Sequence, residues 1–393
     1  MRMQKTYTGP ALFSYGFRPL FLMAGGFAAI AVPLWMAVWT GRVTLGGPFS
    51  PTDWHIHEML FGYTSAVISG FLFTAIPNWT GRMPTRGWPL MALAALWMAG
   101  RLAVAGALPL GPGLVMALDC AFLFAIGAMV TVEIVAGRNW GNLRVVVPVL
   151  LYLAANITFH LEAMQFGSAS YGRRLGFAMV VFLIGLIGGR IIPSFTRNWL
   201  AKQGPGPMPV PFGRFDAASL LLMLGALMAW VAVPEARLAG VALLLAGAVQ
   251  GLRLARWRGW RVWRSALLGM LHLAFAFVPA GLVALGLTVW GLLPAAVGLH
   301  LLGIGAIGGM TLAVMMRASL GHTGRELQAG PALTLAFVSV ALASLVRVAV
   351  PSELGLWLAA TLCTAGFATF VARLAPVLTL PNPARRTPNQ PPR

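Results

Sequence analysis

Charged residues are scarce in this chain. Only 9% of its 393 residues are charged, while 59% are hydrophobic. A soluble globular protein carries about 25% charged residues. The composition therefore excludes an ordinary soluble domain and indicates a protein that is embedded in lipid.

Cysteine is also rare, and several familiar motifs are missing. The two cysteines, Cys120 and Cys363, both lie inside apolar runs and form no CxxC or CxxCH pattern. The sequence thus gives no support for a disulfide framework, a c-type haem attachment site or an iron–sulfur cluster. It also contains no Walker motif, no nucleophile elbow and no HExxH pattern.

Long apolar runs recur along the whole chain. Each is close to the roughly 20 residues that a helix needs to cross a bilayer. Valine and isoleucine do not alternate in short strands, which argues against a membrane barrel. The expected class is an all-α, polytopic transmembrane helical bundle of about twelve spans. The expected spans are 18–40, 55–77, 88–108, 113–135, 145–166, 174–195, 216–233, 238–255, 265–288, 293–316, 331–350 and 354–374.

The net charge of +19 has a topological explanation. Most of the 28 Lys and Arg residues fall on one alternate set of connections between the expected spans. Lys and Arg accumulate on cytoplasmic loops of inner-membrane proteins. We therefore expect both termini in the cytoplasm and no nucleic-acid partner.

The organisation predicted for residues 1–393 is one transmembrane domain. A Pro/Gly-rich loop, 197–213, separates two halves of six helices, 1–196 and 214–376. The Pro-rich tail 377–393 is expected to be disordered.

The stretch "SPTDWHIHEML" predicts a helix start. Ser50 and Asp53 have the spacing of a capping box, and Pro51 lies where a first helical residue is favoured. The helix is therefore expected to be formed at His55. Residues two positions apart on a helix are separated by about 200° of rotation, so His55 and His57 should point to nearly opposite faces.

This stretch is a candidate metal or cofactor site. The separation of His55 and His57 favours two neighbouring sites, or one site and one bystander. Glu58 shares a face with His55 and is a candidate catalytic proton carrier, or a group that orients an imidazole. The alternative without a function is a pair of histidines exposed to water at the membrane interface. Ionisable groups at membrane depth are costly, however, which favours a functional site.

Three more histidines lie inside expected spans, namely His160, His272 and His300. Together with His55 and His57, His160 and His300 can reach similar depths in one leaflet. His272 lies deeper and could supply an axial haem ligand opposite His300, or bond a helix carbonyl. The glycine-rich "GIGAIGG" after His300 would allow a haem to approach closely.

Ligand chemistry favours copper and haem iron. Asn156, His160 and Met164 form an i, i+4, i+8 row that offers oxygen, nitrogen and thioether groups. Imidazoles with soft neighbours suit these metals better than magnesium or calcium. Two arginines near span ends, Arg18 and Arg190, either snorkel to water or pair with haem propionates.

The sequence also contains a weak internal repeat. "IPNWTGR", "IPSFTRNW" and "MMRASLGHTGR" follow the second, sixth and tenth expected spans. An ancestral four-helix unit and a coincidence of helix-terminating residues explain it equally well.

Several segments together resemble the NnrS family of bacterial membrane proteins: "FRPLFLMAG", "WHIHEMLFGY", "GFLFTAIPNWTGR", "GGRIIPSFTRNW" and "GGMTLAVMMRASLGHTGR". The resemblance implies a twelve-helix inner-membrane protein that binds haem b and copper and acts in nitric oxide metabolism and nitrosative-stress resistance. The histidine-bearing motifs of the family fall on His55, His57, His300 and His322. His322, which the residue pattern alone places on an exposed loop, thereby becomes a candidate metal ligand.

The leading hypothesis is a protein that binds or converts NO at a His-ligated centre, as an oxidoreductase served by a membrane electron donor. NO is small and apolar enough to enter from lipid. The rival is a proton-coupled secondary transporter with a His/Glu relay. Against it, the only carboxylates noted near spans are Glu58, Glu133 and Glu162, all close to span ends. A haem-based sensor is a third reading, weakened by short loops.

Overall fold

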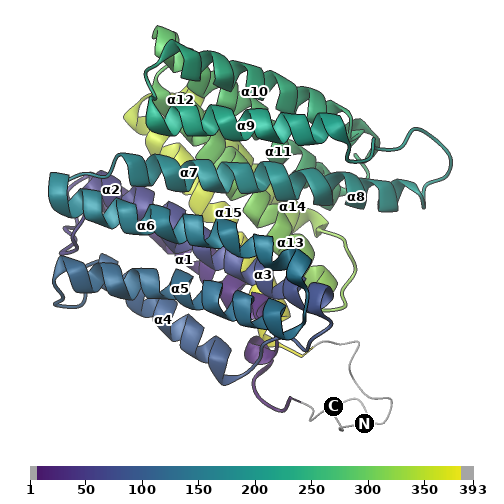
Figure 1. Ribbon diagram of the computed structural model, residues 1–393, viewed down its shortest axis with the longest axis horizontal. Coiled ribbons are helices and arrows are strands. Elements are labelled where there is room, and N and C mark those ends of the chain that lie inside the picture. Colours follow the sequence, from purple (N-terminus) through teal and green to yellow (C-terminus); the bar gives the residue numbers. More distant parts are fainter. Residues whose placement is uncertain (1–6, 382–393) are drawn as a thin grey trace. The chain divides into compact units, whose positions relative to one another are not determined.

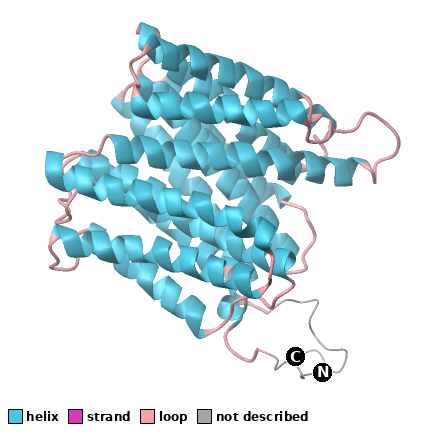
Figure 2. Cartoon of the chain, viewed as in Figure 1, coloured by secondary structure: helices cyan, strands magenta, loops and turns pink. Residues whose placement is uncertain are grey.

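The computed structural model describes residues 7–381, and that part of the chain is helical without strands (Figure 2). Eleven helical segments are long and apolar enough to cross a membrane, and a shorter apolar helix, α4 (Trp88–Val104), completes the expected set of twelve. The predicted all-α transmembrane class is confirmed. The chain is a multi-pass membrane protein whose helices contact lipid; the side on which its termini lie stays a prediction.

The helices follow one another as labelled in Figure 1. They are α1 (Phe17–Trp39), α2 (Pro51–His57), α3 (Thr64–Thr80), α4 (Trp88–Val104), α5 (Pro112–Ala136), α6 (Val146–Phe166), α7 (Tyr171–Leu183), α8 (Gly189–Leu200), α9 (Arg214–Ala232), α10 (Arg237–Ala255), α11 (Ala266–Leu287), α12 (Ala295–His300), α13 (Gly309–His322), α14 (Gly330–Ala349) and α15 (Glu353–Thr379).

The chain divides into two compact units. Unit 1 is Met1–Arg173, Ala318–Leu327 and Phe370–Arg393, and unit 2 is Arg174–Arg317 and Gln328–Thr369. These units do not follow chain order, because the last turns of α13 and α15 are grouped with the first five spans. Residues 377–379 belong to α15, although they were expected in the tail; residues 382–393 of that tail lie outside the described part.

In unit 1, α1 packs against α3, and α5 lies between α4 and α6. The core contains large apolar side chains such as Phe17, Trp97, Tyr152 and Phe159, all nearly inaccessible to solvent. It also contains polar and charged side chains that form the site described below. In unit 2, α11 packs against α10, α12 and α14, and α10 packs against α9.

Three spans contain a π-helical turn. The turns are Glu58–Tyr63, Ile184–Gly188 and Leu301–Gly308, in the second, sixth and tenth spans. Two of them begin directly after a histidine, His57 or His300. The same three spans contain or precede the segments of the weak internal repeat noted in the sequence. Because π-turns are rare and frequently lie at functional sites, they direct attention to these histidines.

Candidate metal centre

The helix that carries the first two histidines begins as predicted. α2 starts at Pro51, and the Ser50 hydroxyl accepts a hydrogen bond from the Asp53 amide at 3.2 Å. The imidazole rings of His55 and His57 lie in different surroundings. His55 stacks on Trp35 with ring centroids 4.6 Å apart, whereas His57 is fully buried.

The π-turn after His57 is held by side chains from other helices. A π-turn displaces backbone carbonyls from their usual partners, and buried carbonyls need donors. The indole Nε1 of Trp97 on α4 donates to the carbonyl of Gly62 at 2.9 Å. The hydroxyl of Tyr152 on α6 donates to the carbonyl of Leu60. These bonds fix the turn that aims His57 and Glu58 into the core.

His57, Asp119 and His160 converge from three helical segments, α2, α5 and α6. Both Nε2 atoms approach the same oxygen, Asp119 Oδ2, at 3.2 Å from His57 and 3.1 Å from His160. One ligand atom from each residue lies within 4.8 Å of the others. The exposed fractions are 0%, 3% and 1%, respectively. Two imidazoles and a carboxylate at this spacing could hold a metal ion.

A second layer of polar groups fixes these three side chains. Asn156 donates from Nδ2 to Asp119 Oδ2 at 2.7 Å, and its Oδ1 lies 3.0 Å from His57 Nε2. On the other side of the His57 ring, Nδ1 lies 3.0 Å from Glu58 Oε1. Arg101 donates from Nη1 to Glu58 Oε1 at 2.6 Å and from Nη2 to Asp119 Oδ1. Outer partners of this kind orient imidazole ligands at metal sites.

The charges of this cluster leave room for a cation. Glu58 and Asp119 supply two carboxylates, and Arg101 supplies one guanidinium. Both ring nitrogens of His57 face oxygen acceptors, whereas a neutral imidazole has only one N–H to donate. Uncompensated charge is costly in a buried site. A proton on the imidazole or a metal ion at Nε2 would each satisfy the arrangement.

Aromatic rings enclose the centre. Phe49 packs on both imidazoles, with centroids 4.7 Å from His57 and 4.9 Å from His160. Phe61 and Phe159 lie 5.4 and 5.2 Å from the His57 ring. An apolar shell limits water access and strengthens the electrostatic interactions inside it.

The sequence interpretation missed two members of the site. It placed the carboxylates of the spans only at span ends, which is wrong, because Asp119 lies inside α5 and is buried. Arg101 on α4 is also absent from the predicted site residues. Each residue interrupts an apolar run, and a charge at membrane depth normally requires a counter-charge. The energetic cost of each unpaired charge could have indicated that Asp119 and Arg101 form an ion pair.

The proposed haem ligands lie in unit 2. The carbonyl of Ala296 lies 2.6 Å from His300 Nδ1 and can only accept, so Nδ1 carries the proton and Nε2 has a free lone pair. His272 Nε2 lies 2.9 Å from the Thr196 hydroxyl. The buried Nδ1 of His272 has no hydrogen-bond partner among the described residues and faces Gly259, where a Cβ would lie 2.7 Å away.

Other candidates have different partners. His322 belongs to unit 1, where its ring packs against Tyr15 and Phe17 at 6.0 and 5.5 Å. Arg18 is buried and donates to the carbonyls of Leu378 and Leu380 at 2.9 and 2.8 Å, near the end of α15. These bonds give Arg18 a helix-capping role that the sequence did not suggest.

The remaining predicted positions are exposed. Arg190 extends over the Phe212 ring at 5.7 Å. Met164 is exposed, so the predicted row on α6 contributes only Asn156 and His160 to the centre. Of the predicted site residues, the structure therefore brings together His57, His160 and Glu58.

Comparison with known proteins identifies a family for this chain. No curated protein matches the chain significantly. The model of the NnrS protein family matches residues 11–382, which is nearly the whole sequence. The chain therefore belongs to the NnrS family.

Proposed function

We propose that this protein holds a metal ion between His57, Asp119 and His160 and acts in nitric oxide metabolism and nitrosative-stress resistance in a bacterial inner membrane. The observation that carries the proposal is the convergence of two imidazoles and one carboxylate in a fully buried, aromatic-lined site. Membership of the NnrS family supports the connection to nitric oxide and the use of copper.

The donor set fits a transition metal. Two imidazole nitrogens and one carboxylate oxygen suit Cu(II), Zn(II) or Fe(II), and a hard ion such as Mg²⁺ would require more oxygen ligands. We propose copper here, because the family resemblance implies it. When bound, copper and haem would supply NO binding and one-electron chemistry.

The chain's own residues prepare the site for that chemistry. Glu58 accepts at His57 Nδ1, so Nε2 is directed toward the metal position. Arg101 holds the carboxylates of Glu58 and Asp119 in place. The ring of Phe49 covers both imidazoles and excludes water. A small apolar ligand such as NO can arrive through lipid and does not need a polar channel.

We propose haem b as the second cofactor, which His300 and His272 would hold. His300 fits this role because its Nδ1–H is held by a backbone carbonyl, which leaves Nε2 available. His272 Nδ1 has no hydrogen-bond partner among the described residues, and it would hold haem iron only after the Gly259 segment that packs on it moves away.

The test is an optical spectrum of detergent-purified protein, oxidised and dithionite-reduced, before and after addition of NO. A reduced b-type haem spectrum that shifts with NO would support the proposal. Asp119→Asn should weaken the NO response through loss of the copper and leave the haem bands intact. Thr158→Ala, on the same helix as His160 but away from the site, is the matched control. Absence of haem and copper from folded protein would contradict the proposal.

A proton-coupled secondary transporter is the second candidate. The observation in its favour is the buried network of Glu58, Asp119 and Arg101, since charges inside membrane bundles commonly mark ion pathways. It predicts solute-dependent acidification or alkalinisation of the lumen of proteoliposomes. The metal-centre proposal predicts no such coupling.

A further inference from the structure

Arginine and tryptophan are concentrated where α10 ends. The segment from Arg253 to Arg264 contains five arginines and three tryptophans; its sequence is "RLARWRGWRVWR". It lies at one end of an apolar span and precedes the next span, α11. Tryptophan and arginine at the end of a span are typical of the membrane–water interface.

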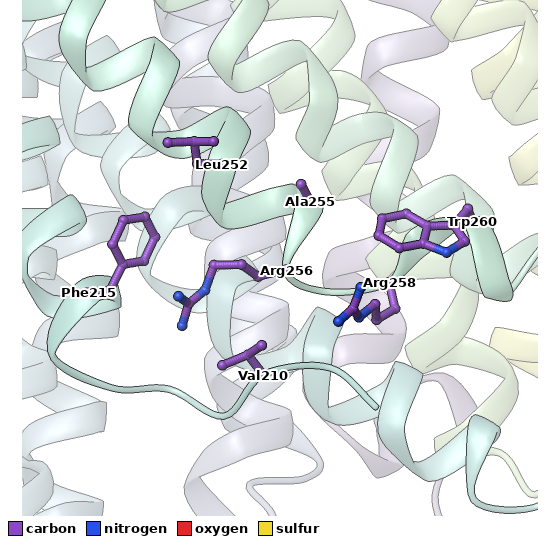
Figure 3. A pocket seen from close by; sticks show the side chains of 7 residues that line it. All are labelled: Val210, Phe215, Leu252, Ala255, Arg256, Arg258 and Trp260. Atoms are coloured by element: carbon purple, nitrogen blue, oxygen red, sulfur yellow. The ribbon is translucent and has the colours of Figure 1, made fainter. Parts of the chain in front are cut away.

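An open groove of about 460 Å³ adjoins this segment (Figure 3). Its apolar walls come from Val210, Phe215, Leu252 and Ala255. Its polar part consists of Arg256 and Arg258, with the indole of Trp260 beside them. The groove therefore joins a surface for an alkyl chain to a pair of guanidinium groups.

The positive charge of the groove is poorly compensated. Asp216 is the carboxylate nearest to it, and its Oδ1 already accepts from the buried Arg253 at 3.0 Å. Arg256 Nη2 lies 3.6 Å from Asp216 Oδ2, beyond hydrogen-bond distance. The Nε of Arg258 is buried and has no hydrogen-bond partner among the described residues. One carboxylate thus serves two guanidiniums, and Arg258 has an unused donor.

The backbone holds Arg258 in an unusual conformation. Its φ and ψ are 60° and 37°, in the left-handed region that a long side chain rarely adopts. Its guanidinium lies 5.4 Å from the centroid of Trp260, whose side chain is 61% exposed. This turn places the guanidinium and the indole together beside the groove (Figure 3).

We infer that this groove binds an anionic glycerophospholipid. Its phosphate would accept from Arg256 and Arg258, and one acyl chain would lie along Leu252, Ala255 and Phe215. Guanidinium pairs recognise phosphate oxygens well, and basic residues at a membrane surface favour anionic lipids over zwitterionic ones. The inference concerns a site in unit 2 and does not depend on the metal centre of unit 1.

Native mass spectrometry of delipidated protein titrated with phosphatidylglycerol or phosphatidylethanolamine tests the site. We expect wild-type protein to prefer phosphatidylglycerol. The double variant Arg256→Gln/Arg258→Gln should bind it roughly thirtyfold more weakly, because each of the two basic residues contributes about 1 kcal/mol near a charged surface. Arg138→Gln/Arg144→Gln removes the same charge from exposed positions of another loop and should bind like wild type.

Leu252→Trp provides a test that keeps every charge. Leu252 is 61% exposed and lines the groove, so a larger side chain there should fill the acyl position and weaken binding without unfolding the protein. Equal binding of both lipids by wild-type protein would overturn the inference. Equal loss in the control double variant, or unchanged binding by Leu252→Trp, would also overturn it.

Discussion

Arg101 is the residue whose removal should unbalance unit 1 most. It is 7% exposed and bridges Glu58 and Asp119, so Arg101→Gln leaves two buried carboxylates without their shared counter-charge. Removing one partner of a buried ion pair costs about 3–5 kcal/mol. Because this arginine serves two carboxylates, we expect a loss near the upper end of that range.

Unfolding in mixed micelles with increasing SDS measures the free energy of unfolding. Arg82→Gln is the matched control, since Arg82 pairs with Glu133 at 2.6 Å but is 45% exposed. Exposed pairs contribute about 1 kcal/mol or less. If Arg101→Gln lowers the free energy of unfolding no more than Arg82→Gln does, the ascribed role of the buried network is wrong.

Two additions sharpen this test. Arg101→Gln/Glu58→Gln leaves a single unpaired carboxylate and should recover part of the lost stability. Copper should stabilise the Arg101→Gln variant if the centre binds it, by about 2.7 kcal/mol at a hundred times the dissociation constant. No recovery in the double variant would show that the lost stability does not come from unpaired carboxylates.

Three further substitutions probe how the site is built, and a fourth, Gly26→Ala, is the control for the first. Gly62→Ala should cost about 1–3 kcal/mol and disturb the buried Arg101–Glu58 pair, because the new Cβ would overlap Arg101 Nη1 and lie 3.1 Å from Glu58 Oε2. Gly26→Ala, at an open helical position, should instead be neutral or stabilising in the same SDS titration. Tyr152→Phe should lose about 1–3 kcal/mol, since the Leu60 carbonyl loses its donor; unchanged stability would mean that the π-turn needs no such bond. Phe49→Ala should speed removal of the metal by a chelator, and an unchanged rate would remove the proposed shielding role.

Much of the fold is encoded in local patterns. Apolar run length predicted eleven helical segments that can cross a membrane and the shorter apolar helix α4, and the Ser50–Pro51–Asp53 pattern identified the start of α2. The spacing also predicted that the side chains of His55 and His57 point to different helix faces, because two positions along a helix correspond to about 200° of rotation. These features depend on neighbours in sequence.

The centre itself depends on helix neighbours, which a single sequence does not provide. His57, Asp119 and His160 are far apart in the chain, and only the packing of α5 against α6 and α3 brings them together. Asp119 was overlooked because a lone aspartate in an apolar run has no visible partner. The π-turn after His57 could not be predicted either, since its carbonyls are satisfied by Trp97 and Tyr152 from other helices.

The metal content of purified His160→Ala protein tests the central claim most directly. His160 contributes Nε2 to the centre and lies away from the proposed haem ligands in sequence. Elemental analysis by mass spectrometry should find the copper of wild-type protein lost from His160→Ala and retained in Thr158→Ala, with both variants folded. Full copper occupancy in His160→Ala would contradict the assignment of this cluster as the metal centre.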